Sequence, residues 1–127
     1  MTKTEYQDQL KHFYGTEAYH ATASLAVALT DGAKFLRDHG LEAVIDTIVA
    51  AQPAIQAKSR PMRSFQVWNL NKTKEGWVLQ GGTGAKRGKP SFEAKFESLP
   101  DFPLDIMQIY VGFNTPAQAV VLLPSEH

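Results

Sequence analysis

The spacing of apolar residues changes half-way along this 127-residue chain, and the change limits the folds that it can adopt. In the first half, apolar side chains recur every three or four residues, as along one face of a helix. From Phe65 onwards they alternate with polar side chains, as in strands that bury one face. Helices followed by strands are typical of an α+β domain, with N-terminal helices packed on one face of a C-terminal antiparallel sheet.

The helical half has clear start and stop signals. Thr2 and Glu5 have capping-box spacing, which predicts a first helix that ends near Gly15. A short helix is expected over about 31–38, capped by Thr30 or Asp31 and closed by Gly40. A longer helix carries a continuous apolar stripe and is expected to end at Pro53. The stripe consists of Leu41, Val44, Ile45, Ile48 and Val49.

The segment between the first two helices, Tyr19 to Leu29, is rich in alanine, but its odd positions are apolar, so we expect it to be extended.

The second half predicts a sheet of four to five strands. The strand candidates are Phe65–Leu70, Trp77–Gln80, Phe92–Phe96, Ile106–Phe113 and Gln118–Leu123. We expect the last of them to be an edge strand, which would allow a homodimer in which it pairs with its own copy. The whole chain, 1–127, is expected to be one domain, with a helical layer at about 1–58 and a sheet layer at about 64–124.

Composition narrows the class of protein. A 43% hydrophobic and 20% charged content is ordinary for a soluble globular protein. The absence of cysteine excludes disulfides, thiolate metal ligands and a cysteine nucleophile. No apolar run exceeds the five residues of Ala119 to Leu123, which is far too short to cross a bilayer. We therefore expect an unprocessed cytoplasmic protein without a membrane partner.

Charge is sorted along the chain although the total is zero. Residues 1–57, 58–95 and 96–127 carry net charges of −3, +7 and −4. Either the middle block forms a basic surface on a neutral protein, or the acidic ends neutralise it in the fold. In the first case its cations would bind an acidic partner. The candidate binding residues are Arg60, Arg63, Lys72, Lys74, Lys86, Arg87 and Lys89.

The last three of these cations lie in a glycine-rich segment that has the composition of a phosphate-binding loop. The spacing differs from that of a nucleotide-binding loop, because Thr83 and Pro90 stand where glycine and a hydroxyl residue are required. The segment that follows also has the pattern of a strand rather than a helix. We therefore predict a flexible hairpin loop here and no nucleotide cofactor.

Trp68 and Trp77 lie in the same basic block, and aromatic residues beside cations are used to bind single-stranded nucleic acids. Both tryptophans fall within strand patterns, where burial in the sheet is the default. Nucleic-acid binding by the basic segment 58–95 remains an alternative function.

Candidate catalytic or metal-ligating residues occur only in the first half. Glu17 and His20 are three residues apart, and His12 and Asp31 are possible further ligands. The histidines show no metal-binding repeat, no serine lies in a nucleophile elbow, and helix capping accounts for the acids. We predict no catalytic residue, no metal and no cofactor, and keep a small enzyme that uses Glu17 and Asp31 as a further alternative.

Four segments carry a resemblance to a known family. They are Phe-Tyr-Gly-Thr-Glu-Ala-Tyr at 13–19, Thr-Asp-Gly-Ala-Lys-Phe-Leu at 30–36, Asp-Phe-Pro-Leu at 101–104 and Leu-Leu-Pro-Ser-Glu-His at 122–127. Together they resemble a small bacterial domain family of unknown function whose members are often carried by phages and plasmids. After the Gly-Thr-Glu segment this chain has His20 to Ala23 in place of the family's aromatic and basic residues, which weakens a charge-based role there. The resemblance implies a fold and a genomic context, and no activity.

In that context we expect a non-enzymatic binding protein of a mobile genetic element that inhibits or modulates a host machine. A CRISPR complex or another defence system is the concrete target, which makes the chain an anti-CRISPR candidate. A basic middle block fits contact with an acidic protein surface or with nucleic acid better than it fits an acidic decoy. A partner in plasmid replication or maintenance is equally open.

Overall fold

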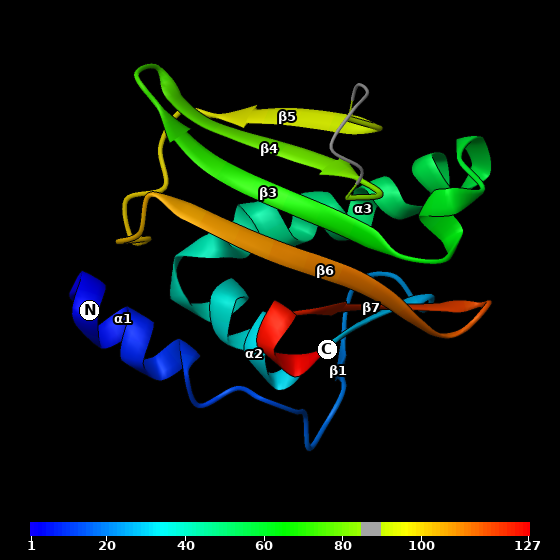
Figure 1. Cartoon of the computed structure of the whole chain (residues 1–127), viewed down its shortest axis with the longest axis horizontal. Coiled ribbons are helices and arrows are strands. Elements are labelled where there is room, and N and C mark those ends of the chain that lie inside the picture. Colours follow the sequence, from blue (N-terminus) through cyan, green and yellow to red (C-terminus); the bar gives the residue numbers. More distant parts are fainter. Residues whose placement is uncertain (85–89) are drawn as a thin grey trace.

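The computed structural model describes residues 1–84 and 90–127, which form an α+β fold around a mixed seven-stranded sheet (Figure 1). The strands lie in the order β1-β2-β7-β6-β3-β4-β5. Their bounds are β1 His20–Ala21, β2 Val27–Leu29, β3 Gln66–Thr73, β4 Gly76–Gly82, β5 Phe92–Phe96, β6 Ile106–Thr115 and β7 Gln118–Leu122. The α+β class is as expected, whereas the sheet has more strands than the four to five expected.

The two additional strands come from the first half of the chain. β1 pairs antiparallel with β2, and β2 pairs parallel with β7, so the sheet is mixed rather than antiparallel. All three residues of β2 are buried, as is usual for a strand inside a sheet with a parallel pair. β7 lies between β2 and β6, so the expectation that it is an edge strand is wrong.

The other strands match their expected positions closely. β5 has the predicted bounds, while β3 and β4 extend towards each other until only Lys74 and Glu75 separate them. Gly76 begins β4 at a φ of +144°, and a Cβ there would lie 2.5 Å from the Phe96 carbonyl oxygen. Only glycine fits this close approach of the hairpin to β5.

The first helix, α1 (Lys3–Leu10), has the predicted capping box at its start. The Thr2 hydroxyl accepts from the Glu5 N–H at 3.1 Å, and the Glu5 carboxylate accepts from the Thr2 N–H at 3.2 Å. The helix ends well before Gly15, whose φ is not positive, so the predicted stop signal is wrong.

The second helix, α2 (Asp31–Leu36), starts at Thr30, whose hydroxyl accepts from the Ala33 N–H at 3.3 Å. It continues into a π-helical turn (Arg37–Leu41), where Gly40 takes a left-handed φ of +108°. Gly40 therefore ends the short helix as its sequence position predicted.

The third helix, α3 (Glu42–Lys58), runs through Pro53 instead of ending there. Proline removes one helical N–H, but the turn beyond it buries Ile55 in the core and closes with a 3.0 Å bond from the Ser59 N–H to the Ile55 carbonyl. Burial of the apolar stripe thus extends the helix past its expected end.

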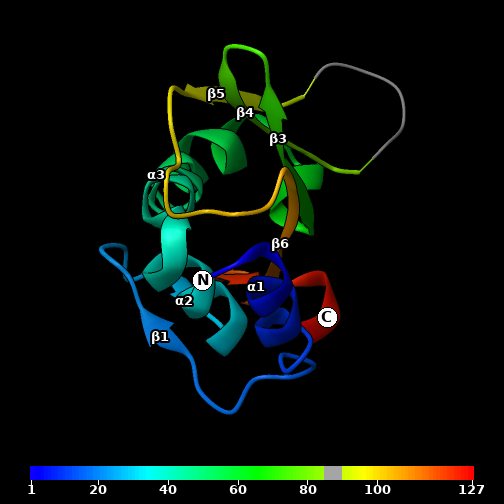
Figure 2. The same cartoon turned by 90° about the vertical axis from the view of Figure 1, so that its left-hand side faces the viewer.

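The main core lies between α3 and the sheet. Figures 1 and 2 show α3 running along one face of the sheet, beside β3, β4 and β6. Ile45 and Ile48 of α3 join Trp68, Leu79 and Ile109 from the strands in one buried cluster. Close-packed burial of this kind is the dominant stabilising term in folding.

A buried amide pair fixes α3 against β3. Gln52 and Gln66 exchange two hydrogen bonds of 2.9 and 2.8 Å, and the Trp68 indole N–H donates to the Gln66 side-chain oxygen at 2.9 Å. The amides also donate to the carbonyls of Ile48 and Met62. Because every buried polar side-chain atom among the described residues has a partner, this polar cluster costs little and sets the position of the helix.

Candidate binding surface

The structure places the predicted binding residues at two separate positions along β3. Arg60 precedes a 3₁₀ turn (Pro61–Arg63) just before the strand and Arg63 is its last residue, whereas Lys72 and Lys74 lie at the far end of the strand. A strand rises about 3.3 Å per residue, so roughly 20 Å separates Gln66 from Lys72. The four side chains therefore form two pairs and no single compact patch. The remaining candidates, Lys86, Arg87 and Lys89, lie outside the described residues.

The ion pairs show whether the acidic ends of the chain neutralise the basic middle block or leave it as a basic surface. Those formed by lysine and arginine within residues 1–84 and 90–127 all lie in the acidic first block. They join Lys11 to Asp8, Lys34 to Asp38, and Arg37 to Asp46 and Glu42. The described basic side chains of the middle block, which are Lys58, Arg60, Arg63, Lys72, Lys74 and Lys95, form no ion pair with a described acid. In the described part of the chain, the acidic ends do not neutralise the middle block through ion pairs.

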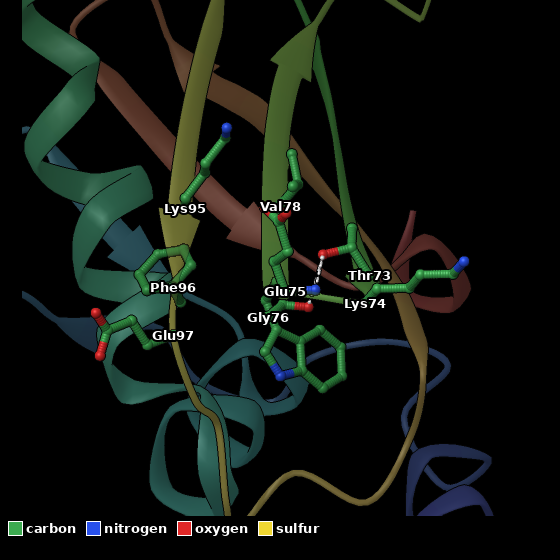
Figure 3. A pocket seen from close by; sticks show the side chains of 9 residues that line it. Thr73, Lys74, Glu75, Gly76, Val78, Lys95, Phe96 and Glu97 are labelled. Carbon is green, nitrogen blue, oxygen red and sulfur yellow. Dashed lines mark hydrogen bonds between the residues drawn. The ribbon is translucent and has the colours of Figure 1, made fainter.

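The far end of β3 borders a hollow of about 610 Å³ between the β3–β4 hairpin and β5 (Figure 3). Its charged lining is mixed, because Lys74 and Lys95 stand beside Glu75 and Glu97. The ammonium groups of Lys74 and Lys95 extend in different directions in Figure 3. The hollow is thus an open surface depression with charges of both signs at its border.

Trp68 and Trp77 are buried, with 0% and 5% of their surfaces exposed. Their placement confirms that both tryptophans belong to the core, so neither presents a ring for stacking on a base. Lys72 extends over the Trp77 ring, with its ammonium 5.8 Å from the ring centroid. This distance is within the range of a cation–π contact, which steadies Lys72 at the end of the strand.

A second hollow of about 550 Å³ lies between residues 21–24 and α3. Its two cations are already paired, Lys34 with Asp38 and Arg37 with Asp46. Arg37 donates two hydrogen bonds to the Asp46 carboxylate, of 2.8 and 3.1 Å, and this contact raises the pKa of the guanidinium above its ordinary value. These charges stabilise the helical layer and offer little to a ligand.

Glu17, His20 and Asp31, which were considered as an acid pair or metal ligands, meet at the start of α2, whereas His12 contacts the Asp8 carbonyl at 2.9 Å instead. The Asp31 carboxylate accepts from the Glu17 backbone N–H at 2.9 Å and contacts the His20 ring at 2.8 Å. The Asp31 N–H donates to the Thr16 hydroxyl at 3.0 Å. Glu17 contributes only its backbone to this contact. Among the residues that the structure describes, no group of three or more potential ligands could hold a metal ion.

These contacts determine the chemistry available to Asp31. The Glu17 N–H, and after it the His20 ring, hold the pKa of the Asp31 carboxyl below its ordinary value. Each carboxylate oxygen already has a partner. A strongly ionised carboxylate with both oxygens engaged favours a structural role in joining the 16–20 segment to α2.

A second carboxylate, that of Glu126, caps the same helix from the other end of the chain. It accepts from the Thr30 hydroxyl at 2.6 Å, and from the backbone N–H groups of Gly32 and Leu123 at 3.0 Å each. A Cβ on Gly32 would collide with the Glu126 carboxylate in its present position, so glycine leaves room for this contact. The sequence singled out this C-terminal segment but gave no signal for its contact with α2, because the partner is more than 90 residues away.

Three of the four segments that carry the family resemblance therefore converge around the N-terminus of α2. A family model described as "Family of unknown function (DUF6876)" matches residues 4–127. The chain belongs to the DUF6876 family. The match spans nearly the whole chain, in agreement with the expected membership of a family of unknown function.

No characterised protein and no solved structure matches this DUF6876 member significantly. None of its described helices is both long and apolar enough to cross a membrane. The family description gives no activity, so any functional argument for this DUF6876 domain depends on its own surface.

Proposed function

We propose that this protein is a non-enzymatic binding protein of a mobile genetic element that engages an acidic surface on a host machine, such as a CRISPR or other defence complex. The genomic context of the proposal comes from the segment resemblance. Its physical basis is the basic block, whose described cations form no ion pair within the described residues and can therefore contact a partner.

The observation that carries the proposal is the contrast between paired and unpaired cations. Lys34 and Arg37, in the acidic first block, are bound to neighbouring acids. Arg60, Arg63 and Lys74 form no ion pair within residues 1–84 and 90–127, and they are exposed. Cations that the fold leaves unpaired give a field that steers an acidic partner and contributes to its specificity.

The separation of the two basic pairs adds a geometric condition. A partner that touches both ends of β3 must present negative charge over roughly 20 Å or more. An acidic protein face of ordinary interface size meets this condition. The backbone of a nucleic acid meets it as well, so nucleic-acid binding is the alternative outcome of the experiment below.

The experiment is affinity capture of the tagged full chain from host lysate, with and without nuclease, followed by mass spectrometry. Two charge-reversal variants are compared, Arg60→Glu/Arg63→Glu and Lys72→Glu/Lys74→Glu. The control is Lys3→Glu/Lys11→Glu, which reverses two charges on α1 and the turn after it. Thermal unfolding of each variant establishes that it is folded.

The proposal expects a stoichiometric, nuclease-resistant protein that both test variants lose and the control retains. Retention of that protein by both test variants would exclude the two basic pairs as the binding surface. Partners that disappear with nuclease would instead assign nucleic-acid binding. A purified oligonucleotide would then bind with a log affinity that falls against log salt by about 0.9 for each phosphate neutralised on duplex DNA.

A further inference from the structure

We propose that the protein forms a symmetric dimer in which β5 of one copy pairs antiparallel with β5 of a second copy, joining the two sheets. This inference goes beyond the proposed function and uses a different part of the surface. It replaces self-pairing through the 118–123 segment, which the fold places inside the sheet.

β5 is the edge strand at one end of the described sheet. It pairs with β4 on one side, and no other described helix or strand makes more than marginal backbone contact with it. Figure 1 shows β5 as the last strand at the top of the sheet, and in Figure 2 it lies in the upper part of the molecule beside β4, with the turn of the β3–β4 hairpin above it. An edge strand of this kind leaves alternate N–H and C=O groups available to a further strand.

The five residues of β5 are complementary to themselves when reversed. The sequence Phe-Glu-Ala-Lys-Phe has an aromatic residue at each end, opposite charges next to them, and Ala94 at the centre. In an antiparallel pair centred on Ala94, Glu93 lies opposite Lys95 of the second copy, and Phe92 lies opposite its Phe96. The two-fold axis repeats each of these contacts, as an isologous interface requires.

The side chains of β5 lie on the faces that this arrangement needs. Phe92 packs towards the core, with its ring centroid 5.4 Å from that of Trp68, and Phe96 contacts the same core. Glu93 and Lys95 are exposed and lie on the opposite face of the strand from Phe92 and Phe96. Pairing would therefore place two Glu–Lys contacts on the open face and two Phe–Phe contacts along the core face.

Neither Glu93 nor Lys95 forms an ion pair within the described residues. One oxygen of Glu93 accepts from the Gln80 side chain at 2.8 Å, and this bond holds the carboxylate over the sheet. Lys95 forms no ion pair with a residue in 1–84 or 90–127. Opposite charges placed directly across a strand pair attract, while like charges there repel.

The charge pattern also selects the direction of pairing. An in-register parallel pair would place Glu93 against Glu93 and Lys95 against Lys95 of the second copy, which is unfavourable. A shift of two residues in an antiparallel pair would lose the reciprocal Glu–Lys contacts. The Ala94-centred antiparallel register satisfies all four charges at once.

The test measures the monomer–dimer equilibrium of the full chain by sedimentation velocity over a concentration series. The wild type should dimerise, and the charge reversals Glu93→Lys and Lys95→Glu should each weaken the dimer by about tenfold or more in Kd, because each places like charges in opposition twice. An equimolar mixture of the two variants should form heterodimers, since the lysines of one chain then face the glutamates of the other.

Two further variants complete the design. Glu93→Lys/Lys95→Glu swaps the charges within one chain and should recover wild-type dimerisation. Lys3→Glu changes the net charge as Lys95→Glu does, but lies on α1 and should leave the dimer intact. Circular dichroism confirms that each variant is folded.

A wild type that stays monomeric throughout the series overturns the proposal. So does a dimer that either single reversal leaves unchanged, or two monomeric single variants that form no heterodimer on mixing. Charge reversal at Arg60, Arg63, Lys72 and Lys74 should leave the dimer intact. Loss of partner capture by those variants therefore tests the proposed function separately from the β5 interface.

Discussion

Replacement of Glu126 by alanine should destabilise the fold strongly, although this residue is the second from the end of the printed sequence. Its half-buried carboxylate accepts three hydrogen bonds, from the Thr30 hydroxyl and from the N–H groups of Gly32 and Leu123. Thr30 and Gly32 form the first turn of α2 and are buried. The substitution would leave their donors in the protein interior without this acceptor.

The magnitude follows from what each donor loses. A buried donor left without a partner costs about 1–3 kcal/mol. Gly32 and Leu123 have no other acceptor in the described structure, whereas the Thr30 hydroxyl also reaches the Val121 carbonyl at 3.3 Å and so loses less. The sum is about 3 kcal/mol in the free energy of unfolding, or about 10 °C in Tm for a domain of this size. Glu126→Gln keeps an acceptor oxygen but loses the charge at the helix N-terminus, and should cost about 1 kcal/mol.

The assay is urea unfolding followed by the fluorescence of the buried tryptophans Trp68 and Trp77. Ser125→Ala is the matched control, because the neighbouring serine is exposed and should change stability by less than about 0.5 kcal/mol. If Glu126→Ala unfolds at the same urea concentration as Ser125→Ala, the carboxylate does not hold the start of α2 and the argument is refuted.

Two other perturbations test the fold. The folded-state pKa of Asp31 is lowered, so the stability that this carboxylate contributes is present above its unfolded pKa of about 3.8 and is lost as pH falls through the lower folded value. Asp31→Asn should therefore flatten the decline of Tm below about pH 4 relative to wild type. An unchanged Tm profile would contradict the contacts assigned to Asp31. Gln66→Ala should cost about 2–4 kcal/mol in urea unfolding, because it removes both hydrogen bonds to the Gln52 side chain and leaves the buried Trp68 N–H without an acceptor, although Gln52 keeps its contacts with Ile48 and Gln56. Gln52→Leu/Gln66→Leu removes both amides of the pair together and should cost less than the single change.

Local signals in the sequence predicted most elements because local contacts form them. The capping box at Thr2, the cap at Thr30 and the left-handed Gly40 all depend on residues within a few positions, and all three are present. The bounds of β5 follow from strict alternation, which no other packing disturbed. Signals of this range do not say which strands pair.

Long-range packing changed the outcome where local signals were weak or opposed. Pro53 is a local stop signal, but burial of Ile55 carries α3 beyond it. Within the 19–29 segment β1 and β2 pair with each other, and the parallel contact of β2 with β7, which no local signal indicates, joins them to the rest of the sheet.

The candidate binding residues could also be predicted only in part from local sequence. The sequence identified the sorted charge and the basic residues, because charge is a property of the residues themselves. It could not show that Arg63 and Lys72 lie at opposite ends of one strand, since that depends on how far β3 extends. It grouped His20 with Asp31 as possible ligands, while the fold made them a contact pair beside α2.

The sequence by itself determined the α+β class, most element positions and the unequal distribution of charge, because periodicity, caps and charge are written residue by residue. Only the tertiary structure decided the strand order, the burial of both tryptophans, the closure of α2 by Glu126 and the free edge at β5. Each of these depends on contacts between segments far apart in the chain, whose geometry is fixed by the packing of the common core.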